Sequence, residues 1–239
     1  MIELSVVMPC YEEAENLKIL LPEIKSVLEK FLPEFESEIL IIDTQSPKDN
    51  TPEICSKFQG VKYISRQGGN DYGDAIRTGI KSSSGKYILI MDADNSHNPQ
   101  DIARLYERIT EGGFDVAAGS RYMKGGSTDN PFILKFMSRV LNICYRILFG
   151  LNIMDVSDSF RIYDGEKLRS INLVCDNFDI VEEILIRLVN KYLDIKITEI
   201  PIAFSKRLYG ESKRDLFKFI LSYLGTIYRL KKLQYRKGD

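Results

Sequence analysis

Cysteine, histidine and long apolar runs are scarce in this sequence. The four cysteines, Cys10, Cys55, Cys144 and Cys175, are far apart, and His97 is the only histidine among 239 residues. Without a Cys-x-x-Cys pair or zinc-ligand spacing, the cysteines predict no metal site, and we expect free thiols in a reducing cytoplasm. No stretch of 18 apolar residues lacks a charge, so no membrane-spanning helix is expected.

Other signals are also missing. Residues 1–3 run directly into a predicted strand, so the sequence shows no signal peptide. Internal repeats and low-complexity linkers are absent as well. No Gly-x-Gly-x-x-Gly follows the first predicted strand, which argues against a dehydrogenase. The length predicts one large domain or two small ones, with enough residues for a sizeable core.

Charge is nearly balanced overall but unevenly distributed. The formal net charge is −1, yet residues 206–237 contain ten Lys or Arg and two Asp or Glu, a net charge of +8 that leaves −9 for the rest. A basic end of this kind is typical of a segment that meets anions, membrane lipid or nucleic acid. No nucleic-acid partner is expected, because no matching motif accompanies the basic segment.

Strand and helix patterns alternate through the first half. Apolar runs predict strands at 3–8, 38–43, 61–65, 86–91 and 114–118, and helical periodicity predicts helices at 14–31, 51–58, 72–83 and 98–110. This alternation predicts an α/β fold with a doubly wound, mostly parallel sheet. After residue 126 we expect helices at 132–149, 179–193 and 215–236 and a strand at 195–203. We interpret 1–125 as a nucleotide-sugar-binding half and 126–239 as a helical, acceptor-binding half of one compact domain.

Two carboxylates follow an apolar predicted strand. Residues 87–91 are continuously apolar, and Asp92-Ala93-Asp94 comes next. Ligands of open α/β sheets bind beyond the carboxyl ends of strands. Two acids there can share a hard cation such as Mg²⁺ or Mn²⁺ with a substrate diphosphate. The alternative is two solvated acids in a surface loop, because the motif alone is short.

Five further motifs accompany Asp92-Ala93-Asp94 in order. They are Pro9-Cys10-Tyr11-Glu12-Glu13, Asp43-Thr44-Gln45-Ser46-Pro47, Gly119-Ser120-Arg121-Tyr122, Asp158-Ser159-Phe160-Arg161 and Arg207-Leu208-Tyr209-Gly210-Glu211-Ser212-Lys213. Over residues 3–213 this set resembles the family 2 glycosyltransferases of the GT-A fold, more narrowly the dolichol-phosphate mannose synthase and polyprenyl-phosphate glycosyltransferase group. Thr44 replaces an Asp of that group near the nucleobase, and Asp158 replaces a Gly.

The resemblance implies an inverting transfer of mannose or glucose from a GDP- or UDP-linked donor to a polyprenyl or dolichyl phosphate. It also implies a cytoplasmic enzyme that is peripheral to the membrane. Because a phosphate acceptor is already ionised near pH 7, it needs cationic side chains rather than a general base. One alternative is a family 2 transferase that acts on a sugar hydroxyl of a glycan or glycolipid. Another is a non-catalytic sugar-nucleotide-binding protein, suggested by Thr44 and Asp158.

The resemblance also assigns roles to single residues. Asp94 is the first expected metal ligand, followed by Asp92 and Ser96, and the alternative for Asp92 is contact with ribose. The predicted catalytic set is Asp94, Arg207, Lys213 and Arg121, in which Arg207 and Lys213 hold phosphates. The expected acceptor-phosphate ligands are Arg121, Lys135 and Arg139. The predicted nucleotide pocket consists of Pro9, Tyr11, Glu13, Asp43, Gly73 and Asp92.

Two interpretations are open for each of three further positions. Gly73 either lets backbone approach the nucleotide or permits close helix packing. His97 either supports the metal loop or has a capping or surface role. Glu183 is expected to form a structural ion pair, although an acid in this half can act as a base where the acceptor is a hydroxyl.

Two predicted helices are basic and amphipathic. Polar stripes at three- and four-residue spacing consist of Lys135, Ser138, Arg139, Asn142 and Arg146 in 132–149, and of Lys218, Ser222, Thr226, Arg229, Lys232 and Arg236 in 215–236. Their broad apolar remainders are typical of helices on a membrane surface. The alternative is burial in the core or in a homo-oligomer. A membrane-protein partner is a further expectation if these helices do not bind lipid.

Overall fold

The computed structural model describes residues 1–33, 36–209 and 225–231, which form one seven-stranded sheet and its covering helices. The strands are β1 (Leu4–Pro9), β2 (Ser37–Asp43), β3 (Val61–Ser65), β4 (Tyr87–Ile90), β5 (Val116–Ser120), β7 (Arg161–Asp164) and β8 (Ile197–Pro201). Their order is β3-β2-β1-β4-β7-β5-β8. Neighbours pair in parallel except around β7, which is antiparallel to β4 and β5. The predicted α/β fold with a mostly parallel sheet is confirmed.

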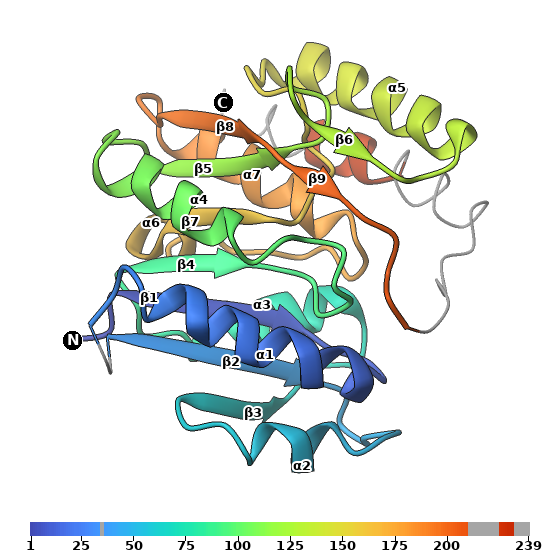
Figure 1. Ribbon diagram of the computed structural model, residues 1–239. Helices are drawn as coiled ribbons and strands as arrows, with labels where there is room; N and C mark the ends of the chain where they lie inside the picture. The colour runs from blue at the N-terminus through green and yellow to red at the C-terminus, as the bar shows by residue number, and fades with distance from the viewer. Residues whose placement is uncertain (34–35, 210–224, 232–239) are drawn as a thin grey trace.

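Helices cover both faces of the sheet (Figure 1). Helices α1 (Ala14–Leu28) and α4 (Asp101–Thr110) pack on one face, and α3 (Tyr72–Ser82), α6 (Gly165–Arg169) and α7 (Ile180–Lys191) pack on the other. Alternate residues of one strand therefore serve two cores. In β1, Val6 and Met8 join the core under α1, whereas Val7 joins the core under α3. This double coverage explains why the central strands contain apolar runs, such as residues 6–8 in β1 and 39–42 in β2.

The remaining elements lie at the margins of the sheet. Helix α2 (Thr51–Cys55) follows β2, and two short strands, β6 (Ser127–Thr128) and β9 (Ala203–Phe204), pair in parallel. Helix α5 (Phe132–Phe149) runs along the upper edge of the molecule in Figure 1. Among the described residues, no helix combines the length and the apolar character needed to cross a membrane.

Most predicted boundaries agree with the structure, and the differences are local. The helix predicted at 132–149 has both its predicted ends, whereas α1 ends at Leu28 and α2 at Cys55. The strand predicted at 195–203 is interrupted after Pro201 and forms β8 and β9. Elements β6, β7 and α6 were not predicted. The helix predicted at 215–236 lies mostly outside the described residues. The part of it that the structure describes, residues 225–231, is helical.

The strand directions bring distant segments to one edge of the sheet. Strands β1, β2, β4, β5 and β8 all point the same way, so their carboxyl ends share an edge, and antiparallel β7 begins there. That edge collects residues 9–13, 43–46, 91–97, 119–122, 155–160 and 201–209. Strands β7 and β8 come from the predicted acceptor half, so both predicted halves contribute to one sheet and to one site.

Candidate active site

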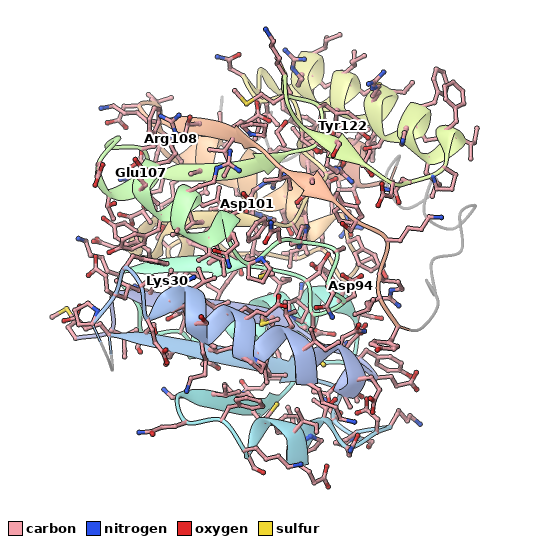
Figure 2. All side chains as sticks on the ribbon, viewed as in Figure 1. Lys30, Asp94, Asp101, Glu107, Arg108 and Tyr122 are labelled. Atoms are coloured by element: carbon pink, nitrogen blue, oxygen red, sulfur yellow. The ribbon has the colours of Figure 1, made fainter. Side chains whose placement is uncertain are left out.

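The loop after β4 presents the two carboxylates of the acid motif. The backbone N–H of Ser96 donates to Asp94 Oδ1 at 3.0 Å, and Asn95 turns the chain with a left-handed φ of 62°. The Asn95 amide ties this loop to α1, donating to the Asn16 backbone and side-chain oxygens at 3.2 and 3.0 Å. Burial alone would raise the pKa of Asp94, but hydrogen bonds from Ser96 and neighbouring positive charge lower it. The loop therefore holds an ionised Asp94 at the sheet edge, where Figure 2 labels it.

The segment after β9 lies across this loop. The N–H of Leu208 donates to the backbone oxygen of Asp94 at 3.2 Å. Arg207 Nη2 lies 3.1 Å from Asp94 Oδ2 and 3.1 Å from Glu13 Oε1. One guanidinium thus joins three motifs that are 113 and 194 residues apart in sequence.

Glu13 is the second acid that contacts this arginine. Burial raises its pKa to about 7, although the charge of Arg207 and a hydrogen bond from Asn16 oppose that rise. Asn16 donates to Glu13 Oε2, which leaves Oε1 for Arg207. In the structure Glu13 contacts Arg207, and its predicted place in the nucleotide pocket stays a prediction.

Asp92 is held by a tyrosine from α3. The hydroxyl of Tyr72 donates to Asp92 Oδ1 at 3.1 Å. The Tyr72 ring stacks on Phe178 with 4.4 Å between ring centroids. The segment before α7 therefore supports the acid motif through Tyr72.

Gly73 serves the same packing contact. Its N–H donates to the Asp176 oxygen at 2.7 Å, and a Cβ added at Gly73 would lie 2.2 Å from the Cys175 oxygen. Backbone of the 173–178 segment thus fills the space beside Gly73. These contacts favour the packing alternative for Gly73, and the approach of a nucleotide to it stays a prediction.

The other residues that were predicted to line the nucleotide pocket are buried or half-buried. Asp43 is fully buried; its Oδ1 accepts from the Thr44 N–H at 2.7 Å and its Oδ2 from the Tyr63 hydroxyl at 3.1 Å. Burial raises the pKa of Asp43 despite these hydrogen bonds. Pro9 is buried at the end of β1, and Tyr11 is half-buried. Tyr11 is therefore better placed than Pro9 or Asp43 to contact a nucleoside.

The guanidinium of Arg121 contacts two buried carboxylates. Its Nε and Nη2 donate to Asp155 Oδ2 and Oδ1, both at 2.7 Å, and its Nε lies 3.2 Å from Asp158 Oδ2. Burial by itself would lower the pKa of Arg121, but Asp155 and Asp158 raise it. In the structure the Arg121 guanidinium therefore holds the segment that leads into β7, and its predicted acceptor-phosphate role stays a prediction.

His97 completes this buried network from the acid loop. Its Nε2 lies 3.2 Å from Asp158 Oδ1, and its ring stacks on Phe160 with 4.8 Å between centroids. Burial opposes protonation, but the carboxylate of Asp158 raises the pKa of His97. The surface alternative is wrong, because the imidazole is buried. The Asp158 carboxylate thus lies between the Arg121 guanidinium and the His97 imidazole.

Three further predicted cations have different positions. Lys135 is half-buried and Arg139 is exposed on α5, and the Arg139 Cζ atom lies 5.4 Å from the centroid of the Tyr122 ring. Figure 2 labels Tyr122 beside α5. Lys213 lies outside the described residues.

Glu183 has the structural role that was predicted. Its Oε2 accepts from the N–H groups of Val174 and Cys175 at 2.9 and 2.8 Å, and its Oε1 accepts from Arg187 Nε at 2.6 Å. The side chain is fully buried. These contacts leave Glu183 poorly suited to act as a general base.

The donor set fits a hard divalent cation that is completed by substrate. The described residues contain no cluster of three or more His, Cys, Asp or Glu able to hold a metal ion alone. Mg²⁺ and Mn²⁺ are commonly bound by one or two carboxylates together with substrate phosphates. Asp92 and Asp94 supply such carboxylates. Ser96 is buried, and its backbone N–H donates to Asp94 Oδ1. Ser96 therefore supports Asp94 through its backbone, and its predicted role as a metal ligand stays a prediction.

Sequence reasoning missed Asp155, Tyr72 and Asn16. Each carries a hydrogen bond to a motif residue, but none belongs to a quoted motif. Asp155 lies three residues before Asp158, and this spacing was the available signal. Tyr72 is 20 residues from its partner Asp92, so no local pattern indicated it. Asn16 is three residues from Glu13 but 79 residues from Asn95, so only its contact with Glu13 had a local signal.

Solved structures define the class of fold. Glucosyl-3-phosphoglycerate synthase from Mycobacterium tuberculosis, in complex with Mn²⁺, UDP and phosphoglyceric acid, matches with a TM-score of 0.73 and 15% identity, over 96% of this chain and 78% of that chain. Its complex with Mn²⁺ and UDP-glucose gives a TM-score of 0.74 at 15% identity, over 96% and 79% of the two chains. The fold is that of the GT-A glycosyltransferases.

Sequence comparison then gives the family. Residues 5–171 match the model of glycosyl transferase family 2. A dolichol-phosphate mannosyltransferase of Pyrococcus furiosus is 37% identical over 96% of this chain, which spans 64% of that protein's length. An undecaprenyl-phosphate mannosyltransferase of Micrococcus luteus is 30% identical over 87% of this chain and 85% of that protein. The chain belongs to glycosyl transferase family 2.

Proposed function

We propose that this protein transfers a sugar, with mannose the first candidate, from a nucleotide diphosphate to a polyprenyl phosphate. Relatives named for mannosyl transfer to dolichol phosphate and undecaprenyl phosphate support this substrate pair. One observation carries the proposal: an acid suited to a divalent cation, Asp94, lies 3.1 Å from a guanidinium suited to phosphate, Arg207. Both lie at the ligand-binding edge of the sheet.

The donor end uses the acid loop and Arg207. A Mg²⁺ or Mn²⁺ ion held by Asp94 and Asp92 would supply Lewis-acid stabilisation of the leaving nucleoside diphosphate. Tyr72 and Ser96 hold these carboxylates in place. Arg207 would bind diphosphate oxygens through charge-assisted hydrogen bonds, which a planar guanidinium can make in pairs.

The acceptor end does not need a general base. A phosphate monoester is ionised at neutral pH and can attack the sugar carbon directly. The acid that could have served a hydroxyl acceptor, Glu183, is buried and fully engaged. This observation favours a phosphate acceptor, with Lys135 and Arg139 on α5 as its candidate cations.

Helix α5 is suited to a lipid surface. It exposes a row of apolar side chains: Phe132, Ile133, Phe136, Val140, Ile143 and Ile147, with Phe132 82% and Ile147 76% exposed. Its charged residues are Lys135, Arg139 and Arg146, all of them basic. Such a helix binds anionic membranes through apolar burial and charge together. We propose that α5 brings the site to its lipid acceptor.

The transfer proposal is tested with purified protein, a polyprenyl phosphate, and GDP-mannose or UDP-glucose. We expect metal-dependent transfer, and a loss of about tenfold or more in Asp94→Asn, because an interaction of one charged group is worth about 1.5–3 kcal/mol. The matched control is Glu107→Gln, an exposed acid on α4 far from Asp94 in Figure 2. Absence of transfer by the wild type with every GDP and UDP sugar tried would overturn the proposal.

The membrane proposal is tested by co-sedimentation with anionic vesicles. Phe132→Ser combined with Phe136→Ser should weaken binding, because it removes apolar side chains that would enter the lipid. Leu193→Ser is the control, since Leu193 is 99% exposed but lies after α7. Equal binding of both variants would remove α5 from the membrane contact.

A further inference from the structure

Arg207 is shared by two acids that belong to different parts of the site. Its Nη2 atom lies 3.1 Å from Glu13 Oε1 and 3.1 Å from Asp94 Oδ2. The three side chains are mostly covered, with 28% of Arg207, 10% of Glu13 and 17% of Asp94 exposed. Of the two acids, Asp94 belongs to the metal motif and Glu13 does not.

A divalent cation and Arg207 would compete for one carboxylate. Both are positive, and both would use the carboxylate of Asp94. A cation bound there competes for the oxygen that Arg207 contacts and repels the guanidinium. Glu13 is the second acid within reach, so it can retain Arg207 when Asp94 turns to the metal.

The backbone contacts of the segment do not depend on the Asp94 carboxylate. The N–H groups of Ser205 and Leu208 donate to the backbone oxygens of Ser96 and Asp94. The side-chain amide of Asn16 lies 3.4 Å from the Tyr209 oxygen. Loss of the Arg207–Asp94 pair therefore leaves the segment attached, and only the guanidinium needs to move.

Glu13 is itself held in position. Asn16 donates to Glu13 Oε2, and Asn95 donates in turn to Asn16, so the acid loop and Glu13 are tied through one amide. These hydrogen bonds restrict the rotation of the Glu13 side chain, and its Oε1 remains directed at Arg207.

We propose that a divalent cation exchanges with Arg207 at Asp94, and that Glu13 is the positioning residue that keeps Arg207 at the site after the exchange. This inference rests on the proposed donor site. Arg207 then serves as an internal cation for Asp94 before the metal binds, and as a phosphate ligand afterwards. Glu13 contacts Arg207 in both conditions.

The exchange is tested by Mn²⁺ titration of the full chain without nucleotide, followed by electron paramagnetic resonance of free Mn²⁺. Arg207→Ala should bind Mn²⁺ more tightly, by roughly fivefold, because a partly exposed ion pair no longer has to be broken. Lys206→Ala is the matched control: it removes the same charge from an exposed neighbour and should change the affinity less than about twofold. Unchanged or weaker binding in Arg207→Ala, or equal tightening in Lys206→Ala, would overturn the exchange.

The positioning role is tested by binding of UDP and GDP in the presence of Mn²⁺. Glu13→Gln and Arg207→Ala should each weaken binding of the nucleoside diphosphate, and the double variant should be no weaker than Arg207→Ala alone, since both act through one guanidinium. Additive losses would show that Glu13 acts on the nucleotide separately and would refute the positioning role.

The outcomes separate this inference from the proposed function. If the wild type binds Mn²⁺ together with a nucleoside diphosphate, the donor site is retained. If the variants then bind Mn²⁺ with the same affinity as the wild type, the exchange is rejected. A wild type that binds no Mn²⁺ even with UDP or GDP rejects the donor site and the exchange together. Arg207→Ala alone decides the exchange if Glu13→Gln does not fold.

Discussion

Asp155→Asn removes one charge from the most deeply buried ionic network in the described structure while keeping the side-chain shape. Asp155 is fully buried, and its two oxygens accept from Arg121 at 2.7 Å each. The Arg121 backbone N–H also donates to it, at 3.0 Å. The substitution leaves a buried guanidinium with Asp158 as its remaining carboxylate partner.

The expected cost follows from this burial. Removing one partner of a buried ion pair costs about 3–5 kcal/mol, because the other charge is left uncompensated. The asparagine oxygen still accepts one hydrogen bond, and Asp158 lies 3.2 Å from Arg121, so we expect a value of about 3 kcal/mol. In a chain of this length 1 kcal/mol corresponds to about 2–4 °C, so the melting temperature should fall by about 6–12 °C.

Calorimetry and urea unfolding measure this loss. The control is Glu15→Gln, which breaks a pair with Lys18 whose side chains are 43% (Lys18) and 60% (Glu15) exposed. Exposed pairs contribute about 0–1 kcal/mol, so this variant should remain close to the wild type. If Asp155→Asn melts within 2 °C of Glu15→Gln, as an order-of-magnitude limit, Arg121 is not held by Asp155 and its acceptor-phosphate role becomes the better reading.

Two further predictions concern pH and packing. The pKa of Glu13 is raised by burial to about 7, so the folded state binds its proton more tightly than the unfolded state, and this contribution to stability is lost as pH rises from about 4.5 to 7. Glu13→Gln should remove that fall, which amounts to about 2–3 kcal/mol between pH 5 and 8; parallel pH profiles of the two proteins would contradict it. Gly73→Ala should destabilise the protein by about 1–3 kcal/mol, because its Cβ would meet the Cys175 backbone at 2.2 Å. Gly225→Ala, in open space, is the comparison, and equal unfolding midpoints would show that the 173–178 segment can shift.

Local patterns in the sequence determined the layers of this fold. Continuous apolar runs in β1, β2 and β4 reported burial on both faces, and helical periodicity gave both ends of α5. The position of Asp92 and Asp94 after β4 also followed, because it depends only on where a strand ends. These features involve neighbouring residues, so the sequence contains the information directly.

Strand order and direction were decided by tertiary structure. Strand β7 is four residues long and begins with the fully buried Arg161, so it has no strong strand pattern. Its antiparallel insertion between β4 and β5 nevertheless brings residues 155–160 to the active edge. Asp155 and Asp158 thereby contact Arg121 and His97, so the Arg121 guanidinium is held by two buried carboxylates.

The same reason limits prediction of the site itself. The motifs identified Asp94, Arg207 and Glu13 one by one, but their common contact spans 113 and 194 residues. Gly73 was recognised as special, yet the choice between nucleotide and packing depended on which backbone lies beside it. The sequence thus determined which side chains could carry the chemistry. The meeting of strand ends at one edge of the sheet decided which of these side chains contact one another, because such contacts depend on topology rather than on local periodicity.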